Sequence, residues 1–160
     1  MAPPSKQVAN FADAVHDIPD GSVVAFGGFA MPGVPHNLIQ ALHAQGAKSL
    51  TCIANTTGGA QQPRMPDIGM LVENGQVKKV ICAFTAATRA SDVLPFTKYY
   101  EAGEIEAELV PQGTLAERLR EAYVLLWPEL QRADGTNWAG VDVDRLRADV
   151  ARWLAGNGGV

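Results

Sequence analysis

The residues best suited to chemistry lie in one glycine-rich stretch near the start of the chain. Residues 27–35 read Gly-Gly-Phe-Ala-Met-Pro-Gly-Val-Pro and join a short apolar run to a helical pattern. Glycines allow backbone N–H groups to approach a ligand closely and to adopt positive φ, and a helix N-terminus adds partial positive charge. The stretch therefore predicts a site for a carboxylate, a phosphate or an oxyanion. The alternative is a tight strand-to-helix turn without a ligand.

Strand-like and helix-like apolar patterns alternate along the chain. Strands are predicted at residues 23–26, 50–54, 77–84 and 105–110. Helices are predicted at residues 8–15, 35–46, 68–73 and 92–102, and from 114 onward. This alternation predicts an α/β fold, an open and mostly parallel sheet with helices on both faces. Because such sheets bind ligands beyond the carboxyl ends of their strands, the four loops that follow the strands are expected to line one edge.

Polar and glycine residues mark the expected helix ends. Ser5 and Thr114 are expected to cap helix starts, and Glu117 completes a capping box with Thr114. Glycines follow three of the helical patterns and are expected to end those helices. They are Gly46, Gly75 and Gly103.

The composition is that of an ordinary globular protein with one core. The chain has 160 residues, of which 47% are hydrophobic and 19% are charged. A formal net charge of −4 and the lack of a Lys/Arg cluster argue against a nucleic-acid partner. No apolar stretch has the length of a membrane span, and the first residues lack the apolar core of a signal peptide. A cytoplasmic protein without a membrane association is therefore expected.

Cysteine and histidine give no sign of a metal or redox site. Cys52 and Cys82 lie singly in apolar runs, which favours buried free thiols over a disulfide or a catalytic thiol. The histidines His16, His36 and His43 have no convincing ligand partners in the sequence. No metal and no tightly bound cofactor are expected.

The glycine-rich stretch belongs to a longer pattern. From Asp20 the sequence runs Asp-Gly, two free positions, three apolar residues, Gly-Gly-Phe, three free positions and Gly-x-Pro. This order resembles the alpha-subunit signature of the family I coenzyme A transferases, which include the 3-oxoacid, acetate and 3-oxoadipate CoA-transferases. Two further blocks resemble the same alpha chains, one from Leu71 to Cys82 and one from Gly103 to Arg120. The second of these contains Pro-Gln-Gly-Thr-Leu-Ala-Glu-Arg, and the resemblance extends from Phe11 to Arg120.

The resemblance implies a component of an enzyme that moves CoA between an acyl-CoA and a small carboxylic acid. In this family a glutamate attacks the thioester and forms an acyl anhydride and then a glutamyl-CoA thioester. The resemblance implies that a separate beta subunit supplies this glutamate, so that the two chains form a hetero-oligomer. Glu73 lies in the Glu-Asn-Gly helix end of alpha chains, and no catalytic residue is assigned to this chain.

The resemblance also implies which residues bind the substrate. Backbone amides of the glycine-rich stretch would contact thioester or carboxylate oxygens, and two amide side chains are secondary candidates. The candidates for substrate and CoA binding are Gly27, Gly28, Phe29, Gly33, Asn55 and Gln112. The Gln112 amide could donate to a substrate carbonyl or satisfy nearby backbone, and both interpretations stay open.

Several positions depart from the family pattern. Many relatives have glycine in place of Ala30, glutamate in place of His36 and a second asparagine in place of Thr56. A lone histidine near a helix start is more often a surface residue than a ligand contact, so His36 is expected to be one.

The resemblance stops before the end of the chain. Alpha chains continue with a Gly-rich segment and a Phe-Tyr-x-Pro-x-Gly-like loop that is absent here, so the chain is expected to be a shortened, divergent alpha subunit that is inactive alone. Residues 1–122 are expected to form the alpha-subunit-like domain. Residues 123–160 are expected to pack on it as a strand at 123–128 and an amphipathic helix at 141–154. The alternatives are other acyl-CoA chemistry on this fold, such as hydrolysis or decarboxylation, and a catalytically silent subunit that binds or regulates a partner.

Overall fold

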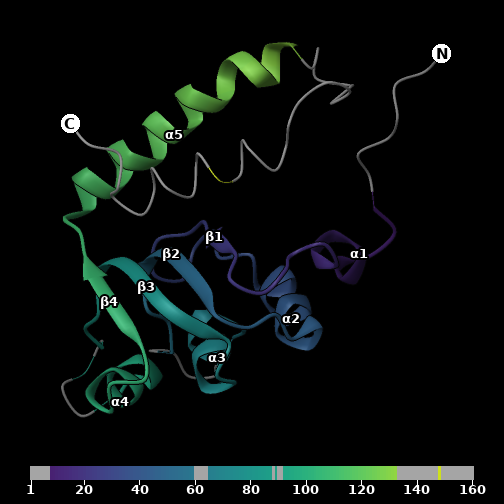
Figure 1. The fold of residues 1–160 in the computed structure, drawn as a ribbon. Coiled ribbons are helices and arrows are strands. Elements are labelled where there is room, and N and C mark those ends of the chain that lie inside the picture. The colour runs from purple at the N-terminus through teal and green to yellow at the C-terminus, as the bar shows by residue number, and fades with distance from the viewer. Residues whose placement is uncertain (1–7, 60–64, 88, 90–91, 133–147, 149–160) are drawn as a thin grey trace. The chain divides into compact units, whose positions relative to one another are not determined.

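The fold is taken from a computed structural model, which describes residues 8–59, 65–87, 89, 92–132 and 148. The chain divides into two compact units. One unit spans Val8–Gln112 and contains the sheet (Figure 1). The other comprises Met1–Gln7 and Gly113–Val160, and its described part is mainly a long helix. All six predicted site residues belong to the first unit.

The first unit is built on a four-stranded sheet in which every neighbouring pair is parallel. Its strands follow the order of the sequence, β1-β2-β3-β4. They are β1 (Val23–Ala25), β2 (Leu50–Thr56), β3 (Val77–Phe84) and β4 (Glu106–Leu109). The predicted parallel α/β fold is therefore confirmed, with strand ends displaced by one or two residues, as is usual for such assignments.

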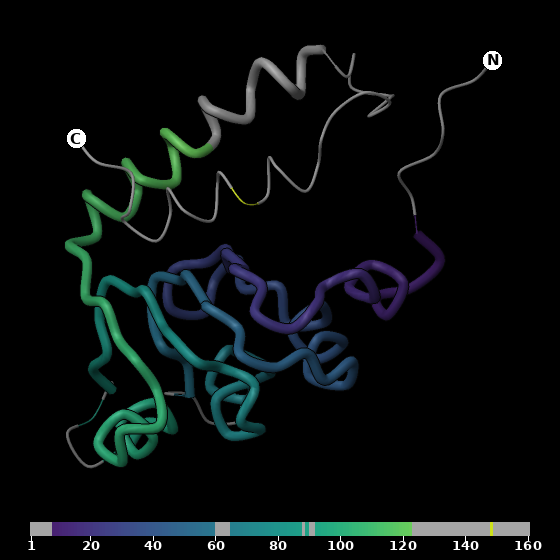
Figure 2. The backbone as a smooth tube through the Cα atoms, in the orientation of Figure 1, coloured from purple at the N-terminus to yellow at the C-terminus, as the bar shows by residue number. Residues whose placement is uncertain are grey.

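One short helix precedes β1 and three others connect successive strands. They are α1 (Phe11–Val15), α2 (His36–Gln45), α3 (Ile68–Glu73) and α4 (Pro95–Glu101). Because each strand lies beside the preceding one and parallel crossovers are right-handed, α2, α3 and α4 lie on the same face of the sheet (Figure 1) and not on both faces as predicted. The repeated path from strand to helix to strand can be followed in Figure 2. None of the described helices combines the length and the apolar content that crossing a membrane requires.

The main core lies between the sheet and these helices. It brings together apolar side chains of β2, β3, α2 and α3. Among them are Leu50, Cys52, Val80, Cys82, Ile39, Leu42, Leu71 and Val72. Ile53 and Ile81 pair in register and are buried as well, on the opposite face of their strands. Burial on both faces explains why β2 and β3 appear in the sequence as nearly continuous apolar runs.

The two cysteines are free and buried in this core, as the sequence predicts. Burial raises the pKa of Cys52 to about 12 and the pKa of Cys82 to about 11. Since the thiolate is the reactive form, we expect neither thiol to react with iodoacetamide at about pH 8 in the folded protein. Both should react after unfolding in urea, as mass spectrometry of the intact chain would show. Rapid labelling of the folded protein at full occupancy would contradict the burial of these thiols.

The raised pKa values also fix the direction of a pH effect. The ordinary pKa is 9.0, so above that pH the unfolded chain loses protons that the folded chain keeps. The contribution of the two buried thiols to the free energy of unfolding is therefore complete below pH 9. It is lost as the pH rises toward 11 and 12, the pKa values of the folded protein.

One buried polar side chain joins the start of β3 to α2. Gln76 is 0% exposed, and its Nε2 donates to the backbone oxygens of Leu42 at 3.1 Å and Ala47 at 3.0 Å. Its Oε1 accepts from Asn74 Nδ2 at 2.9 Å. The Leu42 carbonyl, in the last turn of α2, also accepts from the Gly46 N–H at 3.1 Å, so Gln76 adds a second donor there and a donor to the Ala47 carbonyl just after the helix.

Replacement of this amide should be costly. We expect Gln76→Leu to lower the free energy of unfolding by about 2–3 kcal/mol, because the Ala47 carbonyl and the Asn74 amide lose this buried partner and the Leu42 carbonyl keeps only the Gly46 N–H. Urea denaturation measures the change. Gln45→Ala is the matched control: it also removes two hydrogen bonds, to Ile18 and Ala47, but from an exposed side chain. A loss at Gln76 no larger than that at Gln45 would contradict this role.

Helix starts are where the sequence prediction is least accurate. The cap of α1 is Asn10, whose Oδ1 accepts from the Asp13 N–H at 2.9 Å, and Ser5 lies outside the described residues. Helix α4 begins at Pro95 rather than at residue 92, because the residue before a proline is held extended and Leu94 has ψ 147. The predicted ends at Gly46, Gly75 and Gly103 are confirmed.

The second unit differs more from the prediction. Its helix α5 (Gln112–Arg132) begins two residues before Thr114, so Thr114 is within the helix and is not its cap. The strand predicted at residues 123–128 is wrong, since these residues continue α5. A short apolar run fits a buried strand and a helix equally well, and here the helix that begins upstream continues through it. The helix predicted at 141–154 lies outside the described residues except for residue 148.

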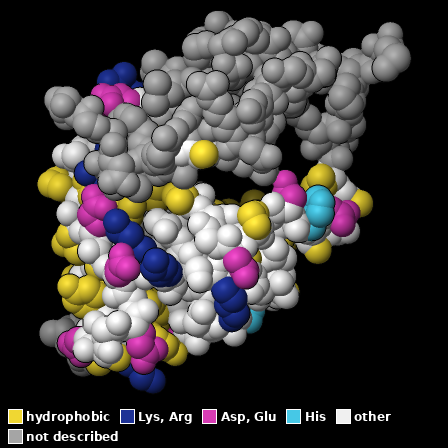
Figure 3. Space-filling model, in the orientation of Figure 1, with side chains coloured by type: hydrophobic (Ala, Val, Ile, Leu, Met, Phe, Trp, Pro, Cys, Tyr) yellow, Lys and Arg dark blue, Asp and Glu magenta, His cyan; other side chains and the backbone are white. Residues whose placement is uncertain are grey.

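The described surface has no cluster of one charge on the face in Figure 3, where acidic and basic side chains are interspersed. Lys79 of β3 pairs with Glu108 of β4 across the sheet, with Nζ and Oε2 3.1 Å apart. A mixed surface of this kind fits the weakly acidic net charge.

Candidate functional site

A pocket opens between the loops that follow β1 and β2, at the carboxyl ends of these strands. It is shallow: its cavity volume is about 20 Å³, which is room for about one water molecule. Its polar and glycine lining comes from both loops and from the start of α3. These residues are Gly27, Gly28, Asn55, Thr56, Gly58 and Asp67. The position agrees with the rule for open parallel sheets, in which ligands bind beyond the carboxyl ends of the strands.

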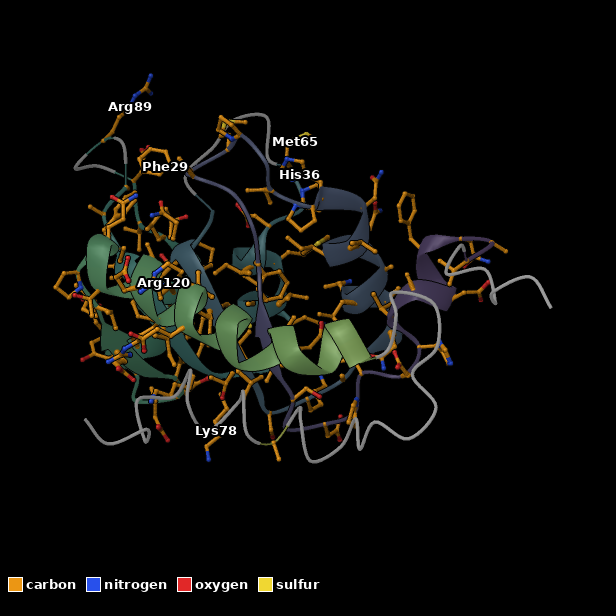
Figure 4. The ribbon with its side chains drawn as sticks, turned by 90° about the horizontal axis from the view of Figure 1, so that it is seen from above. Phe29, His36, Met65, Lys78, Arg89 and Arg120 are labelled. Carbon is orange, nitrogen blue, oxygen red and sulfur yellow. The ribbon has the colours of Figure 1, made fainter. Side chains whose placement is uncertain are left out.

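Labelled side chains show that the loops after β1, β2 and β3 share this edge (Figure 4). Phe29, Met65 and Arg89 each follow a different strand and lie toward the same edge, together with His36. Lys78, at the start of β3, lies at the opposite edge. The expected gathering of these loops at one edge is therefore present.

The structure brings together some of the predicted site residues and separates others. Gly27, Gly28 and Asn55 line the pocket. Phe29 does not: its side chain is 59% exposed, and its N–H donates to the Pro32 carbonyl at 3.0 Å inside the loop. Gly33 lies against Gly28, since a Cβ on Gly33 would be 3.4 Å from the Gly28 Cα, but it does not line the pocket. Gln112 is the exposed first residue of α5 and does not line the pocket either.

The glycine-rich loop folds back tightly at Gly28. Gly28 has φ 111, and a Cβ there would lie 2.7 Å from Val34 Cγ2 and 2.9 Å from the Val34 amide nitrogen. A Cβ at Gly27 would meet nothing closer than the Gly33 carbonyl oxygen, 3.6 Å away. The loop therefore requires glycine at Gly28 for both conformation and space. Its backbone, rather than a side chain, faces the pocket at these two positions.

Asp67 holds the other wall of the pocket in place. It caps α3, with Oδ1 accepting from the Gly69 N–H at 3.0 Å, and its Oδ2 accepts from the Gly59 N–H at 2.6 Å. A carboxylate that accepts two backbone hydrogen bonds fixes the loop after β2 to the start of α3. The sequence prediction missed Asp67, although an aspartate directly before an apolar helical pattern is a signal for an N-cap.

His36 has a structural partner. Its Nδ1 donates to the Pro66 carbonyl at 2.7 Å, and the ring is half-buried. This bond links the start of α2 to the segment just before Asp67. His36 thus stands at a helix start as expected, but it is half-buried and bonded to Pro66 rather than a free surface residue.

Among the described residues, two buried side-chain oxygen atoms near the pocket have no hydrogen-bond partner within the chain. They are Asn55 Oδ1, on a residue that lines the pocket, and Thr57 Oγ1, on a fully buried residue just after β2. Buried polar atoms in proteins are nearly always bonded, and an unsatisfied one is costly. Asn55 Oδ1 therefore fits an N–H or O–H group of a ligand.

The chemistry of the described pocket is that of binding. Its carboxylate, Asp67, accepts two backbone hydrogen bonds, and the Thr56 hydroxyl accepts from the Gly58 N–H at 3.4 Å. Glu73 is exposed at the end of α3 and does not line the pocket. Backbone amides of the glycine-rich loop and the Asn55 side chain remain as the groups that can contact a carbonyl or carboxylate.

A parallel sheet with a glycine-rich loop at its carboxyl edge defines an α/β domain, and comparison with known proteins gives its family. The family described as coenzyme A transferase matches residues 8–124, and the chain belongs to this family. A curated relative, a 3-oxoadipate CoA-transferase subunit of Pseudomonas putida, is 43% identical over 120 residues, covering 74% of this chain and 48% of the relative. The chain spans about half the length of the curated CoA-transferase subunits that it matches in bacteria.

Solved structures give the same result. The glutaconate coenzyme A-transferase of Acidaminococcus fermentans superposes with a TM-score of 0.61 at 27% identity, covering 74% of this chain and 36% of that one. The decarboxylase AibA/AibB superposes with a TM-score of 0.58 at 27% identity, covering 72% and 43%. Proteins that resemble this chain therefore include a transferase and a decarboxylase.

Proposed function

We propose that this protein is the alpha-subunit-like component of a CoA transferase that moves CoA between an acyl-CoA and a small carboxylic acid. The observation that carries the proposal is the pocket at the carboxyl edge, where Gly27, Gly28 and the unpartnered Asn55 Oδ1 come together. Membership of the coenzyme A transferase family and the similarity to single subunits of CoA-transferases support it.

The resemblance to the family I coenzyme A transferases implies a division of labour between two subunits. A separate beta subunit provides a glutamate carboxylate, which attacks the thioester carbonyl, and CoA leaves as the thiolate while an acyl anhydride forms. The thiolate then attacks the glutamyl carbonyl of the anhydride and releases the free acid, which leaves a glutamyl-CoA thioester. The acceptor acid reverses these steps and departs as the new acyl-CoA. Each attack places negative charge on a carbonyl oxygen, which the amides of Gly27 and Gly28 would stabilise.

Three further assignments belong to the same proposal. The beta subunit is the protein partner, CoA thioester is a substrate rather than a resident cofactor, and neither nucleic acid nor membrane is a partner. We place the enzyme in the cytoplasm, and the two free cysteines in the core are in keeping with a reducing compartment. Phe29, Gly33 and Gln112 remain proposed binding residues of the assembled enzyme, although they do not line the pocket.

The test uses the chain together with its beta subunit. Purified chain is mixed with acceptor acids and with acetyl-, succinyl- or acetoacetyl-CoA, in the presence and absence of the protein encoded beside it. Mass spectrometry follows all CoA species. New acyl-CoA formed only in the complete mixture supports the proposal. Release of free CoA or loss of carbon dioxide without transfer would assign hydrolysis or decarboxylation instead. Binding of the two proteins without turnover would assign a silent subunit.

A further inference from the structure

Large apolar side chains are exposed along the carboxyl edge of the sheet. Each of them belongs to the last residue of a strand or to the loop that follows one. They are Phe29 and Met31 after β1, Met65 after β2, Phe84 at the end of β3, Val93 after β3 and Leu109 at the end of β4. Figure 4 shows Phe29 and Met65 toward this same edge, although they follow different strands. We call these residues the apolar rim.

The apolar rim has the character of a protein interface. Exposed apolar side chains that occur singly are normal, whereas a group of them at one edge marks an interaction site. Aromatic and methionine side chains are enriched in the centres of interfaces, and charged side chains are depleted there. The loop after β1, residues 26–35, has no charged residue. Val93 is 76% exposed and Phe29 is 59% exposed, so each has a large apolar surface to bury against a partner.

The glycine-rich loop presents Phe29 from a tightly closed backbone. The Phe29 N–H donates to the Pro32 carbonyl at 3.0 Å. Gly28, the preceding residue, lies so close to Val34 that a Cβ there would be 2.7 Å from Val34 Cγ2. An aromatic side chain on a backbone that is already ordered loses little conformational entropy on binding. Phe29 is therefore suited to be a principal contact of an interface.

The pocket at the same edge indicates which partner covers the rim. Its cavity volume of about 20 Å³ is room for about one water molecule, so this chain by itself does not enclose a CoA thioester. The carboxylate that lines the pocket, Asp67, accepts two backbone hydrogen bonds and is held by them. The attacking carboxylate of the proposed reaction must then come from another chain. A glutamate of the beta subunit reaches this pocket only if that subunit covers the surrounding edge.

We propose that the apolar rim is the surface on which the beta subunit docks, with Phe29 and Val93 as principal contacts. The inference rests on the proposed CoA-transferase function for the identity of the partner. A beta subunit with a complementary apolar surface buries the rim and encloses the substrate between the two chains.

The affinity of the purified chain for the protein encoded beside it tests the inference. Calorimetry measures the Kd of the wild type and of two pairs of variants, each pair matched in residue type. Phe29→Ala should raise the Kd at least about 30-fold, the effect of truncating a principal contact. Phe11→Ala should leave the Kd unchanged, since Phe11 is 52% exposed but belongs to α1, before β1.

The second pair introduces a charge in place of an exposed valine. Val93→Asp should raise the Kd at least about tenfold, because an unpaired carboxylate would be buried in the interface. Val8→Asp is its control, since Val8 is 55% exposed and precedes α1. Because all four side chains are exposed, each variant chain should keep the Tm of the wild type within about 2 °C. Equal effects of the two members of each pair would overturn the docking surface.

CoA transfer is followed in the same mixtures, so that failure of each claim can be distinguished. The expected affinities without any transfer would overturn the proposed function and support the docking surface. Transfer with an unchanged Kd for Phe29→Ala and Val93→Asp would overturn the docking surface and leave the proposed function intact. Self-association of the chain alone, lost in Phe29→Ala, would assign the rim to a second copy of this chain and overturn the inference.

Discussion

Gly28→Val should reduce the kcat/KM of the reconstituted complex by at least about 100-fold, the usual effect of losing an oxyanion donor. A valine at φ 111 is strained, and its Cβ would lie 2.7 Å from Val34 Cγ2 and 2.9 Å from the Val34 amide nitrogen. The backbone nitrogen cannot give way without moving the whole turn. The loop must therefore shift, and the amides of Gly27 and Gly28 move away from the pocket that they line.

Two variants separate this effect from a general loss of folding. Gly75→Val also places a side chain at positive φ, 63, but a Cβ there meets nothing within 4 Å, so it should lower stability and leave kcat unchanged. Gly27→Ala adds a methyl group in the same loop, 3.6 Å from the nearest atom, and should cost much less activity than Gly28→Val. Steady-state kinetics with urea denaturation of each variant gives both quantities. Full activity of Gly28→Val would show that this loop does not contact the substrate.

The fold was predictable from local sequence to a large extent. Glycines after apolar helical patterns correctly marked the ends of α2, α3 and α4, because a residue with positive φ must follow each helix there. Alternating strand and helix patterns were enough for the parallel sheet. Helix starts were harder, since Pro95 and Gln112 begin α4 and α5 where the apolar periodicity alone gives no boundary.

The pocket was predictable only in part, because its walls depend on contacts between residues apart in sequence. Gly27 and Gly28 were candidates from the glycine-rich loop after a strand together with the family resemblance, and Asn55 was a candidate from the resemblance at the loop after β2. Asp67 reaches back to the Gly59 amide, and His36 reaches forward to the Pro66 carbonyl. No pattern within a single element indicates such a pair.

Asn55→Ala should separate activity from stability. The Asn55 Oδ1 is buried without a partner, and an unsatisfied acceptor costs about 1–3 kcal/mol, so its removal relieves a penalty that offsets the lost packing. We expect the free energy of unfolding to stay within about 0.5 kcal/mol of the wild type or to rise. The kcat/KM of the complex should fall about tenfold or more, since one hydrogen bond of about 1.5 kcal/mol to the ligand is lost.

Thr57→Val is the matched control for this experiment. It removes the other unpartnered oxygen with little change of shape, and Thr57 does not line the pocket. The Thr57→Val variant should therefore have a free energy of unfolding similar to that of Asn55→Ala. Its kcat/KM should equal that of the wild type. If Asn55→Ala instead destabilises the chain as Gln76→Leu is expected to do, the Asn55 amide serves the fold. In that case a partner for its oxygen exists within the folded protein, and the pocket loses its side-chain ligand contact.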